Sequence, residues 1–293
     1  MPRKTFEEML TEMKFSPEME FITLSKMFYR PIHYEFPQQV LVSLSTSIDW
    51  NKSIMQLCSE SFALYPVEIR KTYRNLQDYN RALHIDFSRV DTQNKFDKYL
   101  LLCEYVATML QGLSKSGLIM SHDAELIISP TFRQIKESLD SCGYKLILRN
   151  SVYCAVPING GVVEAAKAVT PSLSNDIMYY GHRDMAGNIK GKRDILVHLC
   201  LYLEGVRQDI ERISGSVANA LFNMANQLEV RHNNIAEQSP KYKPFVASLS
   251  QQQLEHWYDN LFKLCITAIL AVDAKLALDE YKEKQERMNK SKI

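Results

Sequence analysis

Glycine, proline and net charge are all scarce in this sequence. Its 293 residues include only 10 glycines and 10 prolines, which favours long helices over a β fold with many turns. The 35 basic and 34 acidic residues leave a formal net charge of +1, so no overall positive field points to nucleic acid, although a local basic face is compatible with this balance. A hydrophobic content of 46% and a charged content of 24% suit a soluble globular protein with one large domain or two smaller ones.

Membrane spans, a secretory signal and paired cysteine motifs are also missing. No apolar run is long enough to cross a bilayer, and the opening MPRKTFEEML contains no apolar signal core. The cysteines are widely spaced, without a CxxC pair: Cys58, Cys103, Cys142, Cys154, Cys200 and Cys265. We therefore expect reduced core cysteines in a cytoplasmic protein with no metal site, no cofactor and no membrane contact.

A phosphate-cradling loop is absent as well. The polar segment GHRDMAGNIKGKRD (181–194) has glycines and four basic residues, but it lacks the GxxxxGK[ST] spacing and follows no buried strand. This disfavours a nucleotide site. His182 in this segment is either part of a polar site or a solvated loop side chain. Asp194 is expected to cap the long helix that follows.

Apolar residues at helical spacing dominate what is present. In the first half they predict helices at Thr5–Lys14, from Pro17 to about Tyr29 with a Ser16 cap, at Gln38–Ile48, from Pro66 onward, from Phe96 to about Ser114, and from Ser129–Pro130 to Ser141. One hairpin is expected, with strands Tyr144–Leu148 and Val152–Val156 around the turn Arg149–Ser151. It serves either as a wing on nucleic acid or as a structural flap.

The second half predicts helices from Val162, at Asn175–Tyr180, from Asp194 to Ile213, at Val217–Leu228 and from about Ser250. The fold class is therefore mainly α, a multi-helix bundle with one small β-hairpin. We divide the sequence into an N-terminal helical region (1–118), a helix–β-hairpin–helix element (119–175) and a C-terminal helical bundle (176–293).

The stretch from Leu228 to Pro244 concentrates the most potential chemistry. Arg231, His232, Asn233 and Asn234 follow the last apolar position of a helix. An arginine can hold a phosphate through its bidentate fork, and a histidine can move protons near neutral pH. Cleavage of RNA without metal needs a base, an acid and a cation of this kind. In a purely structural interpretation, Arg231 caps the carbonyls of its own helix and the other three side chains pin the loop.

A helix pair, an R-x-NN-like motif, a loop and a further long helix resemble the HEPN superfamily over roughly residues 176–285. The preceding GNIKGKRDILVHLCLYLEGVR is similar to the helix that HEPN-containing abortive-infection proteins carry before their motif helix. The resemblance implies a bundle of four to five helices that often forms a homodimer. Many such proteins are metal-independent ribonucleases of toxin–antitoxin and phage-defence systems, and others only bind RNA or proteins.

By the resemblance, Arg231 takes the arginine position of the family motif, and Asn233 and Asn234 match the polar positions after it. The family places a histidine after four to six intervening residues, which in this chain leads to Ala236, Glu237 or Gln238 and to no histidine. Three interpretations are open: Glu237 acts as the acid/base, His232 does so from an unusual position, or the domain is inactive.

Two further residues are candidates for binding substrate. Glu204 and Arg207 lie one turn apart on the preceding predicted helix, where they either face the same pocket or form a surface ion pair.

These features predict an RNA-directed defence or toxin-type protein with a HEPN-like RNA-binding or metal-independent ribonuclease site. The alternative is a non-catalytic HEPN-like interaction or sensor module of a bacterial defence system. A third hypothesis is a DNA-binding regulator that uses the hairpin as a wing. The expected partners are RNA, a second copy of the chain and a partner protein of a defence system.

Overall fold

The computed structural model describes residues 15–31, 52–87, 95–117, 121–230 and 244–290. The helices predicted at Thr5–Lys14 and Gln38–Ile48 lie outside these residues. The described residues are mainly helical with one two-stranded antiparallel hairpin, as the sequence predicts. The chain forms two compact units, Met1–Ala155 and Val156–Ile293, so the sequence region 119–175 contributes to both.

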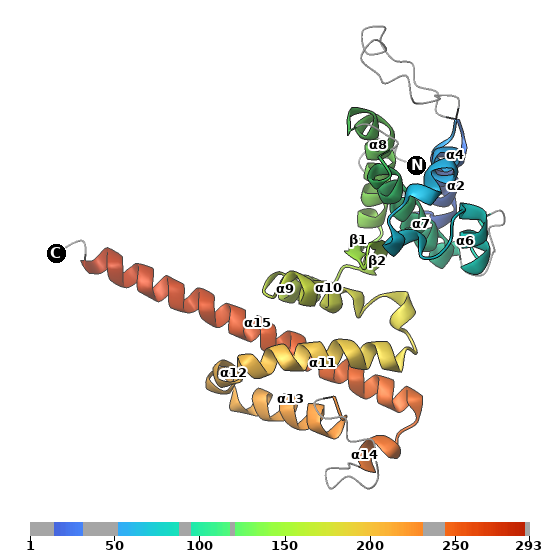
Figure 1. Ribbon diagram of the computed structural model, residues 1–293. Helices are drawn as coiled ribbons and strands as arrows, with labels where there is room; N and C mark the ends of the chain where they lie inside the picture. The colour runs from blue at the N-terminus through green and yellow to red at the C-terminus, as the bar shows by residue number, and fades with distance from the viewer. Residues whose placement is uncertain (1–14, 32–51, 88–94, 118–120, 231–243, 291–293) are drawn as a thin grey trace, which may run out of the picture. The chain divides into compact units, whose positions relative to one another are not determined.

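The first unit is built around one long, almost wholly buried helix. Its elements are α2 (Pro17–Tyr29), α4 (Ile54–Ser61), η1 (Phe62–Leu64), α5 (Val67–Arg70), α6 (Leu76–Ala82), α7 (Lys95–Lys115), α8 (Ser121–Ser141), β1 (Tyr144–Arg149) and the start of β2 (Val152–Pro157). Helix α7 packs against α2, α4 and α8, and β1 packs on α8 (Figure 1). A helix that is apolar on most of its circumference needs such neighbours on every side.

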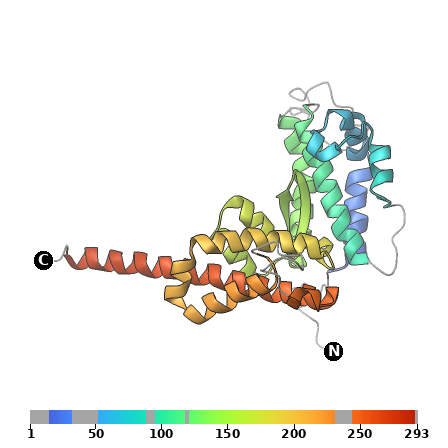
Figure 2. The same ribbon diagram turned by 60° about the horizontal axis from the view of Figure 1, so that its bottom comes forward.

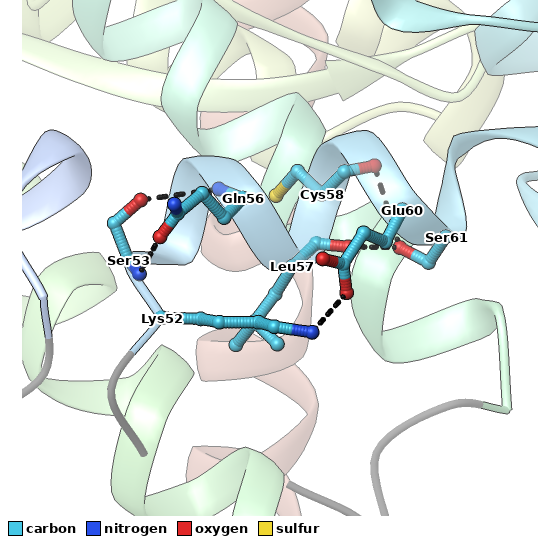
Figure 3. A network of polar contacts seen from close by, with 7 residues as sticks. All are labelled: Lys52, Ser53, Gln56, Leu57, Cys58, Glu60 and Ser61. Carbon is cyan, nitrogen blue, oxygen red and sulfur yellow. Dashed lines mark hydrogen bonds and ion pairs between the residues drawn. The ribbon is translucent and has the colours of Figure 1, made fainter. Parts of the chain in front are cut away.

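Local capping fixes where several of these helices begin. The Ser16 hydroxyl accepts a hydrogen bond from the Met19 amide and starts α2 at Pro17, as predicted. At α4, Ser53 and Gln56 form a capping box, in which each side chain satisfies the other residue's backbone N–H (Figure 3). Lys52 reinforces this turn through an ion pair with Glu60 at 2.8 Å.

The prediction of one continuous helix from Pro66 is wrong. Helix α5 ends after one turn because Lys71 adopts a left-handed backbone conformation, with φ 55° and ψ −130°. Arg70 holds this turn: its Nε donates to the Tyr65 carbonyl at 3.0 Å and its Nη1 to the Tyr73 carbonyl at 3.3 Å. A new helix, α6, then begins at Leu76.

Helix α8 also differs from the prediction, because it begins at Ser121 and contains Pro130 in its interior. An interior proline removes one helical hydrogen bond and costs about 3 kcal/mol. The buried residues that follow it, Thr131, Ile135 and Leu139, lie along one side of the helix and offset this cost by packing.

The hairpin turns through two residues, Asn150 and Ser151, which both have positive φ (49° and 65°). This is the geometry that matches the twist of paired strands. Helix α7 supplies side-chain acceptors to β2: Thr108 Oγ1 accepts from the Tyr153 amide at 3.0 Å, and Glu104 Oε1 accepts from the Ala155 amide at 2.7 Å. Because these amides bind α7, the hairpin is fixed to the first unit as a structural flap would be.

The second unit contains the rest of β2, then α9 (Gly160–Lys167), α10 (Pro171–Tyr179), η2 (Arg183–Met185), α11 (Ile189–Gly205), α12 (Arg207–Ile213), α13 (Gly215–Gln227), α14 (Pro244–Ala247) and α15 (Gln251–Lys290). Helix α15 packs on α9, α11, α12 and α13. Its C-terminal part projects beyond these helices in both views (Figures 1 and 2).

The helix predicted from Asp194 to Ile213 has different ends in the structure. It begins five residues earlier, since the Asn188 side chain accepts from the Gly191 amide at 2.9 Å and caps α11. It ends at Gly205, and Val206 with φ −111° and ψ 16° separates it from α12. Three of the four basic residues of the segment, Lys190, Lys192 and Arg193, therefore lie on the first turns of a helix instead of in a loop.

The cysteines are free thiols, as predicted, and five are buried while Cys142 is partly exposed. Within the described residues, no helix is long and apolar enough to cross a membrane.

Candidate functional site

The predicted site begins at the C-terminus of α13, where the structure describes Leu228, Glu229 and Val230. Glu229 has a φ of 55°, and the Val230 amide donates to the Ala225 carbonyl at 3.0 Å. With the Glu229 amide donating to Asn226, this is a Schellman motif, which normally places glycine at the left-handed position. The helix end is therefore a defined turn, and Val230 is buried beneath it.

Arg193 from the first turn of α11 anchors this helix end. Its Nη2 donates to the Glu229 carbonyl at 2.8 Å. Tyr258 on α15 is buried beside both residues. Burial raises the pKa of the Tyr258 phenol, the nearby Arg193 charge lowers it, and the Glu229 carboxylate raises it. Three helices, α11, α13 and α15, thus meet at Glu229, two residues before Arg231.

A second cation, Lys192, joins α11 to α15 on a neighbouring face. Its Nζ lies 2.8 Å from Glu255 Oε1 and 2.7 Å from Asp259 Oδ1, and its side chain is only 7% exposed. Tyr180 donates its hydroxyl to Asp259 Oδ1 at 3.0 Å, and the Gly187 amide donates to Glu255 Oε1 at 2.8 Å. The buried ammonium is therefore paired with two carboxylates.

Aromatic contacts complete this Lys192 cluster. The Tyr180 and Phe262 rings are stacked with centroids 3.9 Å apart, and the Lys192 Nζ lies 5.3 Å from the Tyr180 centroid. Burial and the neighbouring Asp259 raise the pKa of Tyr180 well above its ordinary value. Hydrogen bonds from Lys192 and from the Gly187 amide lower the pKa of Glu255. Because Lys192 is paired with both Glu255 and Asp259, we interpret these three side chains as a clamp that holds α11 against α15, and not as groups that exchange protons.

An apolar cavity of about 540 Å³ adjoins the same end of α13. It is lined by Ala220, Asn223, Met224, Gln227, Leu228, Phe245 and Trp257. The Phe245 and Trp257 rings pack edge to face with centroids 5.9 Å apart. None of these described lining residues is charged, so this wall of the cavity suits a neutral group.

Each described histidine of this unit contacts a neighbouring side chain. His198 Nδ1 lies 2.7 Å from Asp176 Oδ2, with the imidazole 60% exposed and the carboxylate 11% exposed. His182 is buried and stacks on Tyr179 with centroids 4.8 Å apart, so its interpretation as a solvated loop side chain is wrong. His256 packs against Trp257 at 5.9 Å.

The predicted site residues are distributed as follows. Arg231, His232, Asn233, Asn234 and Glu237 lie outside the described residues, directly after the anchored Glu229 and Val230. Their roles as catalytic or binding residues stay predictions.

Glu204 and Arg207 lie near the opposite end of α11 from Arg193, since eleven residues of helix from Arg193 to Glu204 span about 16 Å. Arg207 donates from Nε to Glu211 at 2.7 Å and covers the Phe222 ring at 4.7 Å. The structure therefore places this pair away from the Glu229 anchor.

Sequence reasoning missed four residues that build the site: Lys192, Arg193, Phe245 and Trp257. The two cations were assigned to a loop, and recognition of Asn188 as a cap would have placed them on one helix. Phe245 and Trp257 lie in different helices, α14 and α15, and no local sequence pattern indicates that these helices bring them together.

No protein-family model matches the chain, and neither a curated protein nor a solved structure matches it. The described residues include no group of three or more His, Cys, Asp or Glu side chains placed to hold a metal ion.

Proposed function

We propose that the C-terminal unit binds RNA at the open end of α13 and cleaves it without a metal ion, in the manner of HEPN-like defence or toxin proteins. One observation carries the proposal: Arg193 and the Schellman turn fix the backbone at Glu229, two residues before Arg231. The fixed backbone at Glu229 favours this chemistry, because an arginine such as Arg231 binds a phosphate productively only when its own position is restrained.

In this proposal Arg231 holds the scissile phosphate and stabilises the charge that develops on it. His232 or Glu237 transfers the proton, and Asn233 and Asn234 orient the RNA. Arg193 is a positioning residue, because it acts on the segment through the Glu229 carbonyl.

The proposal is tested by incubating single-stranded RNA with the full-length protein in the presence of a chelator. Wild type is expected to bind and cleave, whereas Arg231→Ala binds more weakly and cleaves at least tenfold more slowly. Arg212→Ala is the matched control, because Arg212 is 73% exposed and pairs with Asp209 at 3.4 Å in another helix. Equal cleavage by wild type and Arg231→Ala would exclude the catalytic role.

Arg193→Met tests the anchor separately from the phosphate contact. It removes the hydrogen bond to the Glu229 carbonyl but leaves Arg231 in place. We expect weaker RNA binding and slower cleavage, with a smaller loss than in Arg231→Ala. Unchanged binding would mean that the segment does not depend on this anchor.

A non-catalytic RNA-binding or sensor module is the second candidate. It is favoured by the absence of a histidine at the family's motif position and by the engagement of His198 with Asp176. Arg231-dependent RNA binding without cleavage would select this candidate over the ribonuclease.

The proposal also includes assembly with a second copy of the chain and with a partner protein of a defence system. Sedimentation equilibrium of the purified chain tests the first of these. A single monomeric species across the micromolar range would exclude the homodimer.

A further inference from the structure

The cavity beside α13 has a composition that selects its ligand. Leu228 forms a fully buried part of its wall, and Met224, Phe245 and Trp257 are half-buried around it. Asn223 and Gln227 lie one helical turn apart and are exposed, so their carboxamides are placed at the rim. An apolar interior with a few polar groups at its edge is the usual make-up of a small-ligand site, and about 540 Å³ is within the usual size range.

We infer that this cavity binds one unpaired base of the RNA, an assignment that rests on the proposed function. A base has two apolar faces and a polar edge. The faces can stack on aromatic side chains such as Trp257 and Phe245. The edge can exchange donor and acceptor hydrogen bonds with a carboxamide, as Asn and Gln do with adenine.

The described lining of the cavity favours one part of the nucleotide. None of the seven described residues that line it is ionisable at neutral pH, so a phosphate placed against them would lose its hydration without gaining a partner. The base is the neutral part of the nucleotide and is the part that gains from burial. The cation proposed to hold the phosphate is Arg231, and Arg193 positions its segment through the Glu229 carbonyl.

The cavity adjoins the helix end that precedes the proposed phosphate-binding residue in the sequence. Leu228 lines the cavity, Glu229 is the residue anchored by Arg193, and Arg231 follows two residues later. In the proposed function, a strand of RNA held by Arg231 also offers a neighbouring base to the cavity. Duplex RNA keeps its bases stacked and paired, so this arrangement predicts a preference for single strands.

Fluorescence of Trp257 provides a direct test, because the chain has only two tryptophans. Trp50→Phe removes the other one, which lies outside the described residues. This background is titrated with a single-stranded RNA hexamer, with the same sequence as a duplex, and with an abasic strand of the same length. We expect the single strand to quench Trp257 emission, and the duplex and the abasic strand to bind without quenching it.

Substitutions identify the contacts. Trp257→Leu is expected to weaken binding of the single strand by roughly 5- to 100-fold without changing binding of the abasic strand. Trp257→Phe, which keeps an aromatic face, restores most of the affinity and controls for misfolding. Asn223→Ala with Gln227→Ala reduces discrimination among the four bases. Asn219→Ala, one turn away on the exposed face of α13, leaves it unchanged.

The outcomes separate this inference from the proposed function. If RNA binding depends on Arg231 but neither quenches Trp257 nor changes in Trp257→Leu, the base site is wrong and the RNA function stands. If no RNA binds, both proposals fail. If the abasic strand binds as tightly as the normal one in every variant, the cavity serves another occupant, such as an apolar peptide, and the inference is overturned.

Discussion

Replacement of Lys192 by methionine tests how the second unit holds its helices in place. Methionine keeps an apolar stem of similar length, but it removes the charge that pairs with Glu255 and Asp259 and lies over the Tyr180 ring. Loss of one partner from a fully buried ion pair costs about 3–5 kcal/mol, whereas an exposed pair contributes about 0–1 kcal/mol. The lysine side chain is 7% exposed, but the carboxylates are 24% and 40% exposed.

Water can therefore hydrate part of both carboxylates once the lysine is gone. We expect a loss of roughly 2–3 kcal/mol in the free energy of unfolding, between the two limits. For a unit of this length, that lowers the Tm by about 6–10 °C. Differential scanning calorimetry measures this change in Tm. Lys190→Met is the matched control, because Lys190 is exposed on the same helix. A shift no larger than that of Lys190→Met would refute the clamp.

The same variant changes the response to acid. Lys192 and the Gly187 amide hold the pKa of Glu255 below its ordinary value of 4.5. A depressed folded pKa gives stability that is present above the ordinary value and is lost as pH falls through the folded value. We therefore expect the Tm difference between wild type and Lys192→Met to shrink below about pH 4.5. A difference that stays constant down to pH 3 would contradict the ion pair.

Three further substitutions test the first unit by thermal unfolding. Gly112→Ala places a methyl group against the Tyr65 ring, so we expect a loss of at least about 1–3 kcal/mol, while Gly215→Ala, where nothing lies within 4 Å, is tolerated. Lys71→Gly relieves a left-handed backbone and should raise stability by about 1 kcal/mol, whereas Lys71→Ala should not. Ser53→Ala removes one half of a capping box and should cost about 1 kcal/mol. The opposite sign in any of these would contradict the local geometry.

Helical periodicity was sufficient to predict the fold class because most helices here bury one continuous face. The Ser16 cap, the core of α7 and the hairpin were also recoverable, since each depends on residues close together in the chain. The division of the helix predicted from Pro66 into α5 and α6 could not be predicted. It depends on a hydrogen bond from Arg70 to the Tyr65 carbonyl, and a lysine such as Lys71 gives no local signal for a positive φ.

The candidate site shows a similar division. The sequence predicts that α13 ends near Leu228, where apolar periodicity stops, and the structure ends this helix at Gln227. The roles assigned to the residues beyond it stay predictions. The Arg193 anchor could not be predicted from the sequence. Asp194 matches a helix cap as well as Asn188 does when only local preferences are compared, so Arg193 could not be assigned to the helix. The aromatic cavity depends on α13, α14 and α15 coming together, and contacts between distant segments leave no periodic signal in any of them.

The ribonuclease proposal is decided by incubating single-stranded RNA with wild type, Arg231→Ala and Arg212→Ala in the presence of a chelator. We expect cleavage by wild type and Arg212→Ala, with the rate reduced at least tenfold in Arg231→Ala. RNA left intact and unbound by all three proteins would contradict it.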